Sequence, residues 1–394
     1  MSKRVAILGA GPIGMEAALA AVAAGHDPVV YERGPGIGAG VRRWGHVRTF
    51  TPWSMTVSPR ARAALGETAP DGPDLPTGNE IVERLLEPLA GLPQLAGRIH
   101  ARTAVTAVGR AGLLKHEEIG SAARAARPFR LLLRDEVTGE ERVDHARVVI
   151  DATGVSGTPN RMGDGGIDAI GERRFEERID RHLVDLAADH AGWAGRTILL
   201  TGAGHSAQTA ARDLADFAAR AGVGTRVIWA IRAARPSFGA VPGDTLAERA
   251  ALNATARELA AGASTAVEVR TGVVTEALTA RGDRLEVTLR NGDAQRVVVD
   301  RILALNGGVG DASIYRQLQV HECYASLGPM KLAATLGDPD ADCLAGSVSG
   351  PEALRNPEPG FFILGAKSYG RNPQFLLRTG WQQVDDVFGA LLAG

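Results

Sequence analysis

The sequence predicts an α/β protein with two parallel-sheet domains. Two glycine-rich loops, at residues 9–14 and 202–207, each follow a continuous apolar run, at residues 5–8 and 197–201. A continuous apolar run is typical of a parallel strand that is covered on both faces, whereas a half-exposed strand alternates. A chain of 394 residues agrees with two or three domains at roughly 150 residues each.

The first strand–loop–helix unit continues with a helix at residues 13–24, which Gly25 ends, and a strand at residues 28–31. Residues 33–77 are rich in Gly, Pro, Arg and Trp. They predict a long functional loop, because loops of this length are otherwise uncommon. A helix is expected at residues 79–89. Further strands are expected at residues 99–108, 129–133, 142–143 and 146–151, with a polar surface excursion at residues 116–126.

The second unit continues with a helix at residues 206–220 and a strand at residues 226–231. A helix at residues 246–259 precedes a meander of alternating strands between residues 267 and 299. The remaining expected elements are a buried strand at residues 301–305 and a terminal helix at residues 376–392. The pattern predicts two Rossmann-like three-layer domains. We expect the second domain, at residues 161–308, to be inserted into a discontinuous first domain at residues 1–160 and 309–394.

The composition argues against several classes of protein. The formal net charge is −1, so no strong field would attract nucleic acid or an anionic membrane. No apolar segment approaches the roughly 20 residues that a membrane-spanning helix requires. Residues 1–4 lead straight into the first strand rather than into a signal peptide. We therefore expect a cytoplasmic protein without nucleic-acid or membrane partners, and a homodimer is among the oligomeric states left open.

The first glycine loop has the residues of a dinucleotide site. Gly9 permits a tight turn, Gly11 lets the backbone approach a pyrophosphate, and Gly14 lets the helix pack on the strand. The helix N-terminus stabilises the phosphate charge. Glu32 lies 23 positions after Gly9 (32 − 9), where a carboxylate accepts hydrogen bonds from both ribose hydroxyls. A carboxylate disfavours a 2′-phosphate, so this site is expected to hold FAD or NAD rather than NADP.

The second glycine loop differs at the position that contacts the ribose. Its third glycine is replaced by Ala207, an accepted variant, and no carboxylate ends the following strand. Arg232 and Arg235 stand there instead, and guanidinium groups bind phosphate in a bidentate fork. The site therefore predicts NADPH, although solvated arginines at a strand end remain an alternative. The expected NADPH contacts are Gly202, Gly204, Ser206, Ala207, Arg232 and Arg235.

Three further segments resemble motifs of one superfamily. Residues 149–154 resemble its return strand near FAD, residues 303–308 a second copy in which Asn306 departs from the usual Thr, and residues 362–366 its C-terminal FAD motif. Nearly the whole chain thus resembles the two-dinucleotide-binding-domain flavoproteins, which include flavin-containing and N-hydroxylating monooxygenases and thioredoxin-reductase-like enzymes. The resemblance implies FAD in the first domain and NADPH in the inserted one. The implied FAD contacts are Gly9, Gly11, Gly14, Glu32, Arg33, Val105, Thr153, Gly154, Gly365 and Ala366.

Candidate catalytic residues lie in two segments. The superfamily lines its flavin ring with the segment that matches residues 41–53. Arg42, His46 and Arg48 there could stabilise an anionic flavin or a flavin peroxide by charge and hydrogen bonding. A cap whose arginines form surface ion pairs is the alternative. Lys367 follows the C-terminal motif and could bind an acidic substrate group, or could equally be a surface side chain.

The two cysteines, Cys323 and Cys343, bear on the choice among subfamilies. A disulfide reductase of this superfamily needs a close pair, typically with two or four residues between the cysteines. Here the cysteines are 20 residues apart (343 − 323), so structural thiols are favoured, although a redox pair formed by folding stays open. His321 with two cysteines is an incomplete ligand set, and no metal is expected.

These observations favour an FAD-dependent oxidoreductase that is reduced by NADPH. Without a suitable cysteine pair, dioxygen is the expected acceptor, and a flavin hydroperoxide would oxygenate a nitrogen or sulfur centre of a small-molecule substrate. One alternative is an NAD(P)H-dependent flavin reductase or dehydrogenase that passes electrons to a quinone, a thiol or a protein. A second alternative is a non-catalytic nucleotide-binding regulator.

Overall fold

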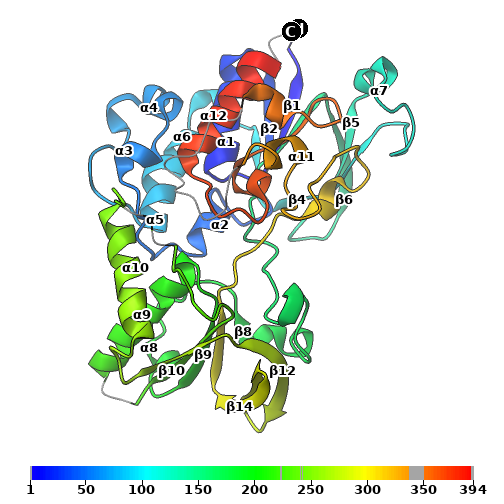
Figure 1. Cartoon of the computed structure of the whole chain (residues 1–394). Coiled ribbons are helices and arrows are strands. Elements are labelled where there is room, and N and C mark those ends of the chain that lie inside the picture. Colours follow the sequence, from blue (N-terminus) through cyan, green and yellow to red (C-terminus); the bar gives the residue numbers. More distant parts are fainter. Residues whose placement is uncertain (1, 222–223, 240, 242, 337–349, 392–394) are drawn as a thin grey trace. The chain divides into compact units, whose positions relative to one another are not determined.

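The computed structural model describes residues 2–221, 224–239, 241, 243–336 and 350–391. The chain divides into two compact units, shown in Figure 1. Unit 1 comprises Met1–Thr158 and Val309–Gly394, and unit 2 comprises Pro159–Gly308.

Unit 1 is built on a parallel sheet of five strands in the order β16-β7-β1-β2-β3. Leu8 of β1 pairs with Tyr31 of β2 and with Asp151 of β7, and Asp151 pairs with Ile363 of β16. The strands therefore end at one edge, where the residues after each strand come together. The strand bounds are β1 Arg4–Leu8, β2 Asp27–Tyr31, β3 Ile99–His100, β7 Val148–Asp151 and β16 Phe361–Ile363.

The two faces of this sheet are covered differently. Val5 and Ile7 pack with the helices, whereas Ala6 and Leu8 pack with an antiparallel meander, as the alternation of a strand requires. The covering helices are α1 (Pro12–Ala23) and α12 (Leu377–Asp386), which continues as a π-helical turn at Val387–Leu391. The meander consists of β4 (Thr103–Arg110), β5 (Phe129–Asp135) and β6 (Glu141–Ala146).

The expected helix at residues 79–89 is present as three consecutive helical pieces. It begins at a capping box, in which the Thr77 hydroxyl accepts from the Glu80 N–H and the Glu80 carboxylate accepts from the Thr77 N–H. The pieces are α5 (Gly78–Ile81), the π-turn Val82–Leu86 and α6 (Glu87–Ala90). Further short helices of unit 1 are α2 (Ala39–Arg42), α3 (Trp53–Thr56), α4 (Pro59–Leu65), α7 (Ala122–Ala126) and α11 (Met330–Ala333). Its 3-10 turns are Gly66–Thr68, Pro93–Leu95, Ala312–Tyr315, Pro351–Leu354 and Gly365–Tyr369.

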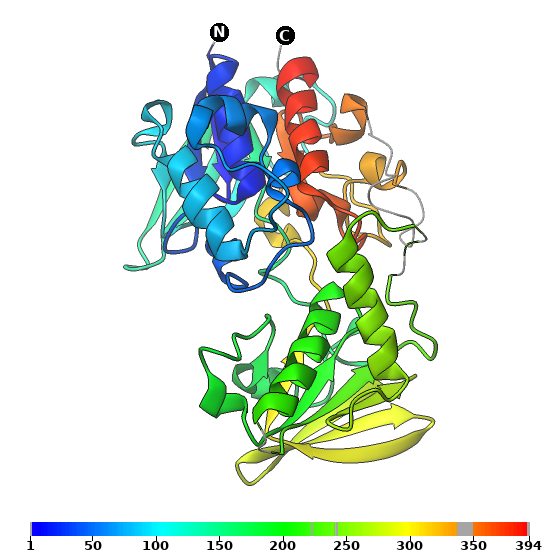
Figure 2. The same cartoon turned by 90° about the vertical axis from the view of Figure 1, so that its left-hand side faces the viewer.

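Unit 2 repeats the three-layer design. Its parallel sheet has the order β11-β10-β9-β15-β8 and is covered by helices on one face and by a meander on the other (Figure 2). The parallel strands are β8 Ile179–Asp180, β9 Thr197–Thr201, β10 Arg226–Ile231, β11 Val267–Thr271 and β15 Arg301–Ala304. The helices are α8 His190–Trp193, α9 His205–Ala221 and α10 Ala247–Ala260, with 3-10 turns at Asp164–Gly166 and Arg173–Arg178. The meander strands are β12 Val274–Arg281, β13 Arg284–Asn291 and β14 Asp293–Val299.

Two expectations about the elements were wrong. The segment at residues 267–271 is β11, a parallel edge strand beside β10, and not the first strand of the meander. Its polar alternation reflects the edge position, where part of one face stays accessible. The polar excursion at residues 116–126 is not wholly at the surface, because it contains Arg124, which is fully buried. In the part of the chain that the structure describes, no helix is long and apolar enough to cross a membrane.

Candidate functional site

The first glycine loop joins β1 to α1 and is shaped by two close approaches of the backbone, at Gly9 and Gly14. Gly9 has φ +95°, and a Cβ there would lie 2.8 Å from the carbonyl oxygen of Ala152. A Cβ on Gly14 would lie 1.9 Å from the carbonyl oxygen of Gly9. Gly11 faces open space, with no atom within 4 Å of its Cβ position, and no side chain caps α1 there. The first N–H groups of α1 are therefore open to an anion.

Glu32 lies beside this loop at the end of β2. Its Oε2 accepts from the Ala10 N–H at 2.8 Å and its Oε1 from the Gly34 N–H at 2.7 Å. The carboxylate is thus held next to the open side of the loop. Arg33 is exposed, and a Cβ on Gly157 would lie 3.2 Å from its guanidinium.

Lys367 lies in a buried polar cluster at the same edge of the sheet. Its Nζ donates to Asp151 Oδ2 at 2.6 Å, to Thr153 Oγ1 at 3.1 Å and to the Asp311 carbonyl at 2.8 Å. Both charged side chains are at most 2% exposed. Neither role expected for Lys367 fits this position, because its three N–H groups already have acceptors and it is not at the surface. It joins the turn after β7 to the C-terminal motif.

The C-terminal motif is held between α1 and α12. Gly365 has φ +75°, and a Cβ there would lie 3.2 Å from the Ile13 side chain. The Gly365 N–H donates to Gln383 Oε1 at 2.9 Å, and the Gln383 amide also donates to Ser368 Oγ at 2.9 Å. The other residues of the expected FAD contacts occupy the same unit. Ala366 and Val105 are half-buried, Thr153 is exposed, and Gly154 has φ +70° with open space around its Cβ position.

An apolar pocket of about 210 Å³ lies next to the glycine loop, wholly within unit 1. It extends from Pro12, the first residue of α1, to the start of α12. The polar residues that line it, among those the structure describes, are three threonines and Arg378. The apolar lining comprises Pro12, Val41, Trp44, Met55, Ile81, Phe375, Leu376 and Leu377.

The three polar candidates of the loop at residues 41–53 do not line this pocket. The Arg42 guanidinium pairs with Glu83 at 3.4 Å and with Glu87 at 2.7 Å on an exposed surface. Arg48 is exposed and donates to the Leu75 carbonyl, and His46 is exposed. The ion pairs of Arg42 are those expected of a cap, whereas Arg48 is held by a backbone carbonyl and not by an ion pair in the part of the chain that the structure describes. The loop contributes Val41, Trp44, Thr49 and Thr51 to the pocket instead.

The second glycine loop joins β9 to α9 in unit 2 with the same geometry. Gly202 has φ +111°, and a Cβ there would lie 2.2 Å from the Leu305 carbonyl oxygen. Gly204 again faces open space, and Ala207 is fully buried against the strand layer. Ser206 is exposed in the first turn of α9.

The ribose position of unit 2 follows from the strand register. Ala230 pairs with Thr201, so Ile231 lies one step further, beside Gly202, where unit 1 has Glu32 beside Gly9. Ile231 is fully buried and carries no charge. Arg232 and Arg235 follow it, both exposed and without an ion pair to any other residue that the structure describes. Their guanidinium groups are therefore available to an anion.

No family model and no curated protein matches this sequence. Among solved structures, bacillithiol disulfide reductase YpdA from Bacillus cereus has a TM-score of 0.71 at 17% identity, with 99% of each chain covered. Thioredoxin reductase from Lactococcus lactis has a TM-score of 0.60 at 16% identity, with 99% of each chain covered. The cadaverine monooxygenase DfoA from Erwinia amylovora, solved with FAD bound, has a TM-score of 0.63 at 13% identity over 100% of this chain and 96% of that chain.

The chain has the fold of the two-dinucleotide-binding-domain flavoproteins. The resemblance drawn from the motifs is confirmed at the level of the fold, as is the α/β class with two Rossmann-like three-layer domains. Reductases and monooxygenases share this flavoprotein fold, so the fold leaves the reaction type to other observations.

Of the two cysteines, only Cys323 lies within the described residues, and Cys343 lies outside them. Hydrogen bonds from the Ser326 hydroxyl and from the Ser326 and Ala325 N–H groups lower the pKa of the Cys323 thiol. Cys323 does not line the apolar pocket. Within the described ranges, no group of three His, Cys, Asp or Glu side chains could hold a metal ion.

The Gly14→Ala substitution is expected to weaken FAD binding. The added methyl group would meet the Gly9 carbonyl oxygen, so the loop or the helix would have to move. Overpacking of this kind costs about 1–3 kcal/mol, which corresponds to roughly a 5- to 150-fold rise in the FAD dissociation constant. Fluorescence titration of FAD measures the change. Gly36→Ala, at a position with no atom within 4 Å, is the matched control and should bind FAD as the parent does.

Proposed function

We propose that the protein is an FAD-dependent oxidoreductase that is reduced by NADPH, with FAD in unit 1 and NADPH in unit 2. The observation that carries this proposal is the pair of glycine loops with matching geometry and opposite neighbouring charge. Each loop has a positive-φ glycine against a neighbouring strand and an open glycine at a helix N-terminus. Glu32 stands beside the first loop, and Arg232 and Arg235 stand near the second.

The residues of unit 1 fit FAD. The open face of Gly11 and the uncapped start of α1 suit the pyrophosphate, and the Glu32 carboxylate suits the adenosine ribose. The apolar pocket begins at Pro12 and offers an aromatic and aliphatic lining for the isoalloxazine ring. Bound FAD supplies the capacity to accept hydride from NADPH and to react with dioxygen. The protein supplies the orientation of the ring and the exclusion of water from it.

We further propose that the reaction is monooxygenation of a nitrogen or sulfur centre in a small molecule, with dioxygen as co-substrate. Among the described residues, the pocket lining has no cysteine and no carboxylate, so these residues offer neither a thiol for disulfide exchange nor a carboxylate base. A dry, apolar surrounding protects oxygenated species from water. The solved structures with this fold include a cadaverine monooxygenase and an ornithine hydroxylase, so amines, together with thiols, are the first substrates to test.

A reductase that passes electrons to a thiol, disulfide or quinone is the second candidate. The likeness to the bacillithiol disulfide reductase over 99% of both chains favours it. Cys323, with its lowered thiol pKa, is the group in the described residues that such chemistry could use.

Oxygen labelling separates the two candidates. The FAD-loaded protein is reduced anaerobically with NADPH and then mixed with ¹⁸O₂ and a panel of amines and thiols, and product mass and hydrogen peroxide are recorded. A monooxygenase transfers one labelled oxygen atom to a product. If all the consumed oxygen appears as hydrogen peroxide with every substrate, and a disulfide or quinone is reduced instead, the reductase assignment replaces the monooxygenase.

Charge reversal at both Arg232 and Arg235 is expected to abolish the preference for NADPH over NADH. Each hydrogen bond to a charged group contributes about 1.5–3 kcal/mol, so the ratio of kcat/KM for NADPH to that for NADH should fall at least about a hundredfold. The rate of flavin reduction by each nucleotide gives this ratio. An unchanged ratio in the double Glu variant would remove the assignment of the 2′-phosphate to these residues.

A further inference from the structure

Gln208, in the second turn of α9, connects two loops of unit 2. Its side chain is only 1% exposed. Its Nε2 donates to the carbonyl of Ala203, within the glycine loop, at 2.9 Å and to the carbonyl of Phe238 at 3.1 Å. Phe238 belongs to the segment at residues 232–239, called here the arginine loop because it contains Arg232 and Arg235. One carboxamide therefore ties the arginine loop directly to the glycine loop.

The arginine loop is held in an unfavourable backbone conformation at this contact. Phe238 has φ +56°, a region that residues with a side chain rarely adopt unless their surroundings impose it. Its ring is buried and lies 5.5 Å from the Trp229 ring, and the Trp229 indole N–H donates to the Gly202 carbonyl at 2.8 Å. The same two loops are thus joined a second time, through an aromatic pair.

The connection leaves a buried acceptor without a partner among the described residues. Gln208 Oε1 has no hydrogen-bond partner among the residues that the structure describes. Asn253 on α10 repeats the arrangement, since its Nδ2 donates to the Gly239 carbonyl at 3.2 Å while its buried Oδ1 has no partner in the described ranges. Unsatisfied buried polar atoms are unfavourable and call for a compensating role. Here the shared role is to hold the carboxyl end of the arginine loop.

We propose that Gln208 is a positioning residue that sets the preference of unit 2 for NADPH over NADH. This proposal rests on the proposed function. The pyrophosphate would bind at the glycine loop and the 2′-phosphate at the arginine loop, so a nucleotide with both groups spans the two. Fixing the loops relative to each other before binding removes the ordering cost of bringing Arg232 and Arg235 to the 2′-phosphate. A nucleotide without the 2′-phosphate does not depend on that distance.

The test uses Gln208→Met, which keeps the length of the side chain and removes both donors. Dissociation constants of NADP⁺ and NAD⁺ are measured by calorimetry on the FAD-loaded protein. Losing this tether should weaken NADP⁺ binding about tenfold, while NAD⁺ binding changes little. Asn253→Leu removes only the hydrogen bond between α10 and the arginine loop. It should raise the ratio of the NADP⁺ to the NAD⁺ dissociation constant as well, but by a smaller factor. Gln295→Met, on β14 and exposed, is the matched control and should leave both constants unchanged.

The outcomes separate this proposal from the proposed function. If the parent protein prefers NADP⁺ and Gln208→Met retains the parent ratio of dissociation constants, the positioning role is wrong and the function stands. If both constants rise equally, Gln208 is merely structural and the proposal is also wrong. If the parent protein shows no preference for NADP⁺, the nucleotide assignment fails together with the proposal. If Gln208→Met does not fold, the ratio of the NADP⁺ to the NAD⁺ dissociation constant in Asn253→Leu tests the positioning role instead. An unchanged ratio in that variant would contradict the proposal.

Discussion

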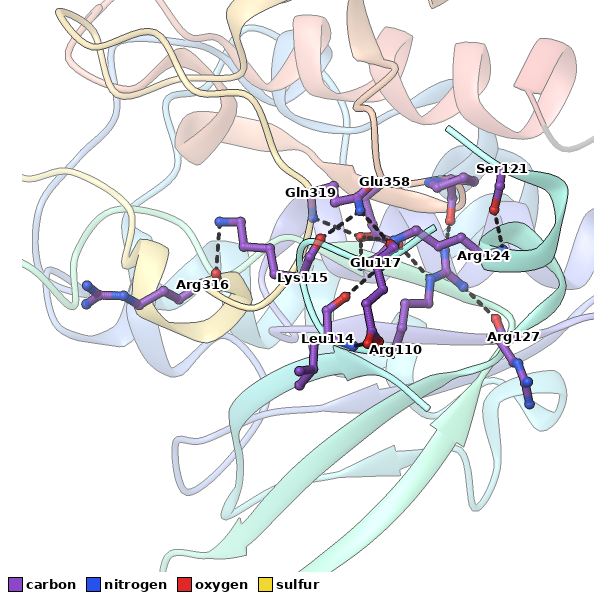
Figure 3. Close-up of polar contacts among 11 residues, drawn as sticks. Arg110, Leu114, Lys115, Glu117, Ser121, Arg124, Arg127, Arg316, Gln319 and Glu358 are labelled. Carbon is purple, nitrogen blue, oxygen red and sulfur yellow. Dashed lines mark hydrogen bonds and ion pairs between the residues drawn. The ribbon is translucent and has the colours of Figure 1, made fainter. Parts of the chain in front are cut away.

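Replacing Glu358 with glutamine is expected to lower the free energy of unfolding of unit 1 by about 3–5 kcal/mol. Figure 3 shows Arg110 and Arg124 converging on this carboxylate. Glu358 Oε1 accepts from Arg110 Nε at 2.6 Å, and its Oε2 accepts from Arg124 at 2.7 Å and from the Gln319 N–H at 2.8 Å. All three charged side chains are at most 1% exposed. The substitution leaves two buried guanidinium groups without a counter-charge.

The loss of stability should extend to β16, because Glu358 lies three residues before the first residue of that strand. Arg110 also donates to the Pro359 carbonyl, and its guanidinium stacks 3.6 Å above the Phe129 ring. Chemical denaturation gives the free energy, and hydrogen exchange in peptides from β5 and β16 locates the loss. Glu352→Gln removes an exposed ion pair with Arg355 and is the control, with an expected change below about 1 kcal/mol. Equal stability of the two variants would contradict the account of the cluster.

The same cluster predicts a loss of stability in acid. Burial alone would raise the pKa of Glu358, but hydrogen bonds from Arg124, the Gln319 backbone and Arg110 outweigh it and hold the pKa below its ordinary value. A depressed pKa in the folded state means that the unfolded state binds the proton more readily. The contribution of Glu358 is therefore complete above its unfolded pKa of about 4.3 and is lost as the pH falls through the lower folded value. Glu358→Gln should show a flatter decline of stability over that range.

Lys367→Met is expected to cost about 3–5 kcal/mol as well and to weaken FAD binding. The substitution would leave the Asp151 carboxylate buried without its cation, at the end of β7 next to Thr153. Lys367 also holds the Asp311 carbonyl, so its loss frees both the turn after β7 and the chain at residues 309–311. The turn after β7 leads to Gly154, and Gly365 lies two residues before Lys367 in the sequence; both glycines are among the residues expected to contact FAD.

A second variant separates charge from shape at this site. Asp151→Asn combined with Lys367→Met removes both charges and leaves no buried ion, so it should recover much of the lost stability. FAD content and denaturant midpoint are measured for the parent, both single variants and the double variant. If the loss of stability in the double variant equals the sum of the losses in the two single variants, the two side chains act independently. The ion pair then does not organise this edge of the sheet.

The sequence predicted the parts of the fold that local pattern determines. The apolar strands and the glycines after them identified both loops, because a positive φ and a close backbone approach permit little other than glycine at Gly9 and Gly202. Glu32 was expected at the end of β2 and is held there by Ala10 and Gly34. These features depend on neighbours along the chain or on one adjacent strand.

The missed features depend on segments that are distant in the sequence. The pocket is lined by Trp44 and Met55 together with Phe375 and Leu376, which are more than 300 residues away in the sequence. Periodicity within a segment does not predict contacts between segments so far apart. The partner of Lys367 is Asp151, which is 216 residues away in the sequence. Without that partner in view, the sequence pattern indicated an exposed or substrate-binding lysine. Arg124 lies in a polar stretch that the sequence pattern assigned to the surface, because its partner Glu358 is 234 residues away.

Anaerobic titration of the FAD-loaded protein with NADPH tests the central claim most directly. The account predicts that the purified protein is yellow, that its flavin absorbance bleaches in proportion to the NADPH added, and that NADH acts more weakly. A colourless protein that takes up no FAD would contradict the assignment of unit 1. A bound flavin that neither nucleotide reduces would contradict the claim that the two glycine loops serve one electron transfer.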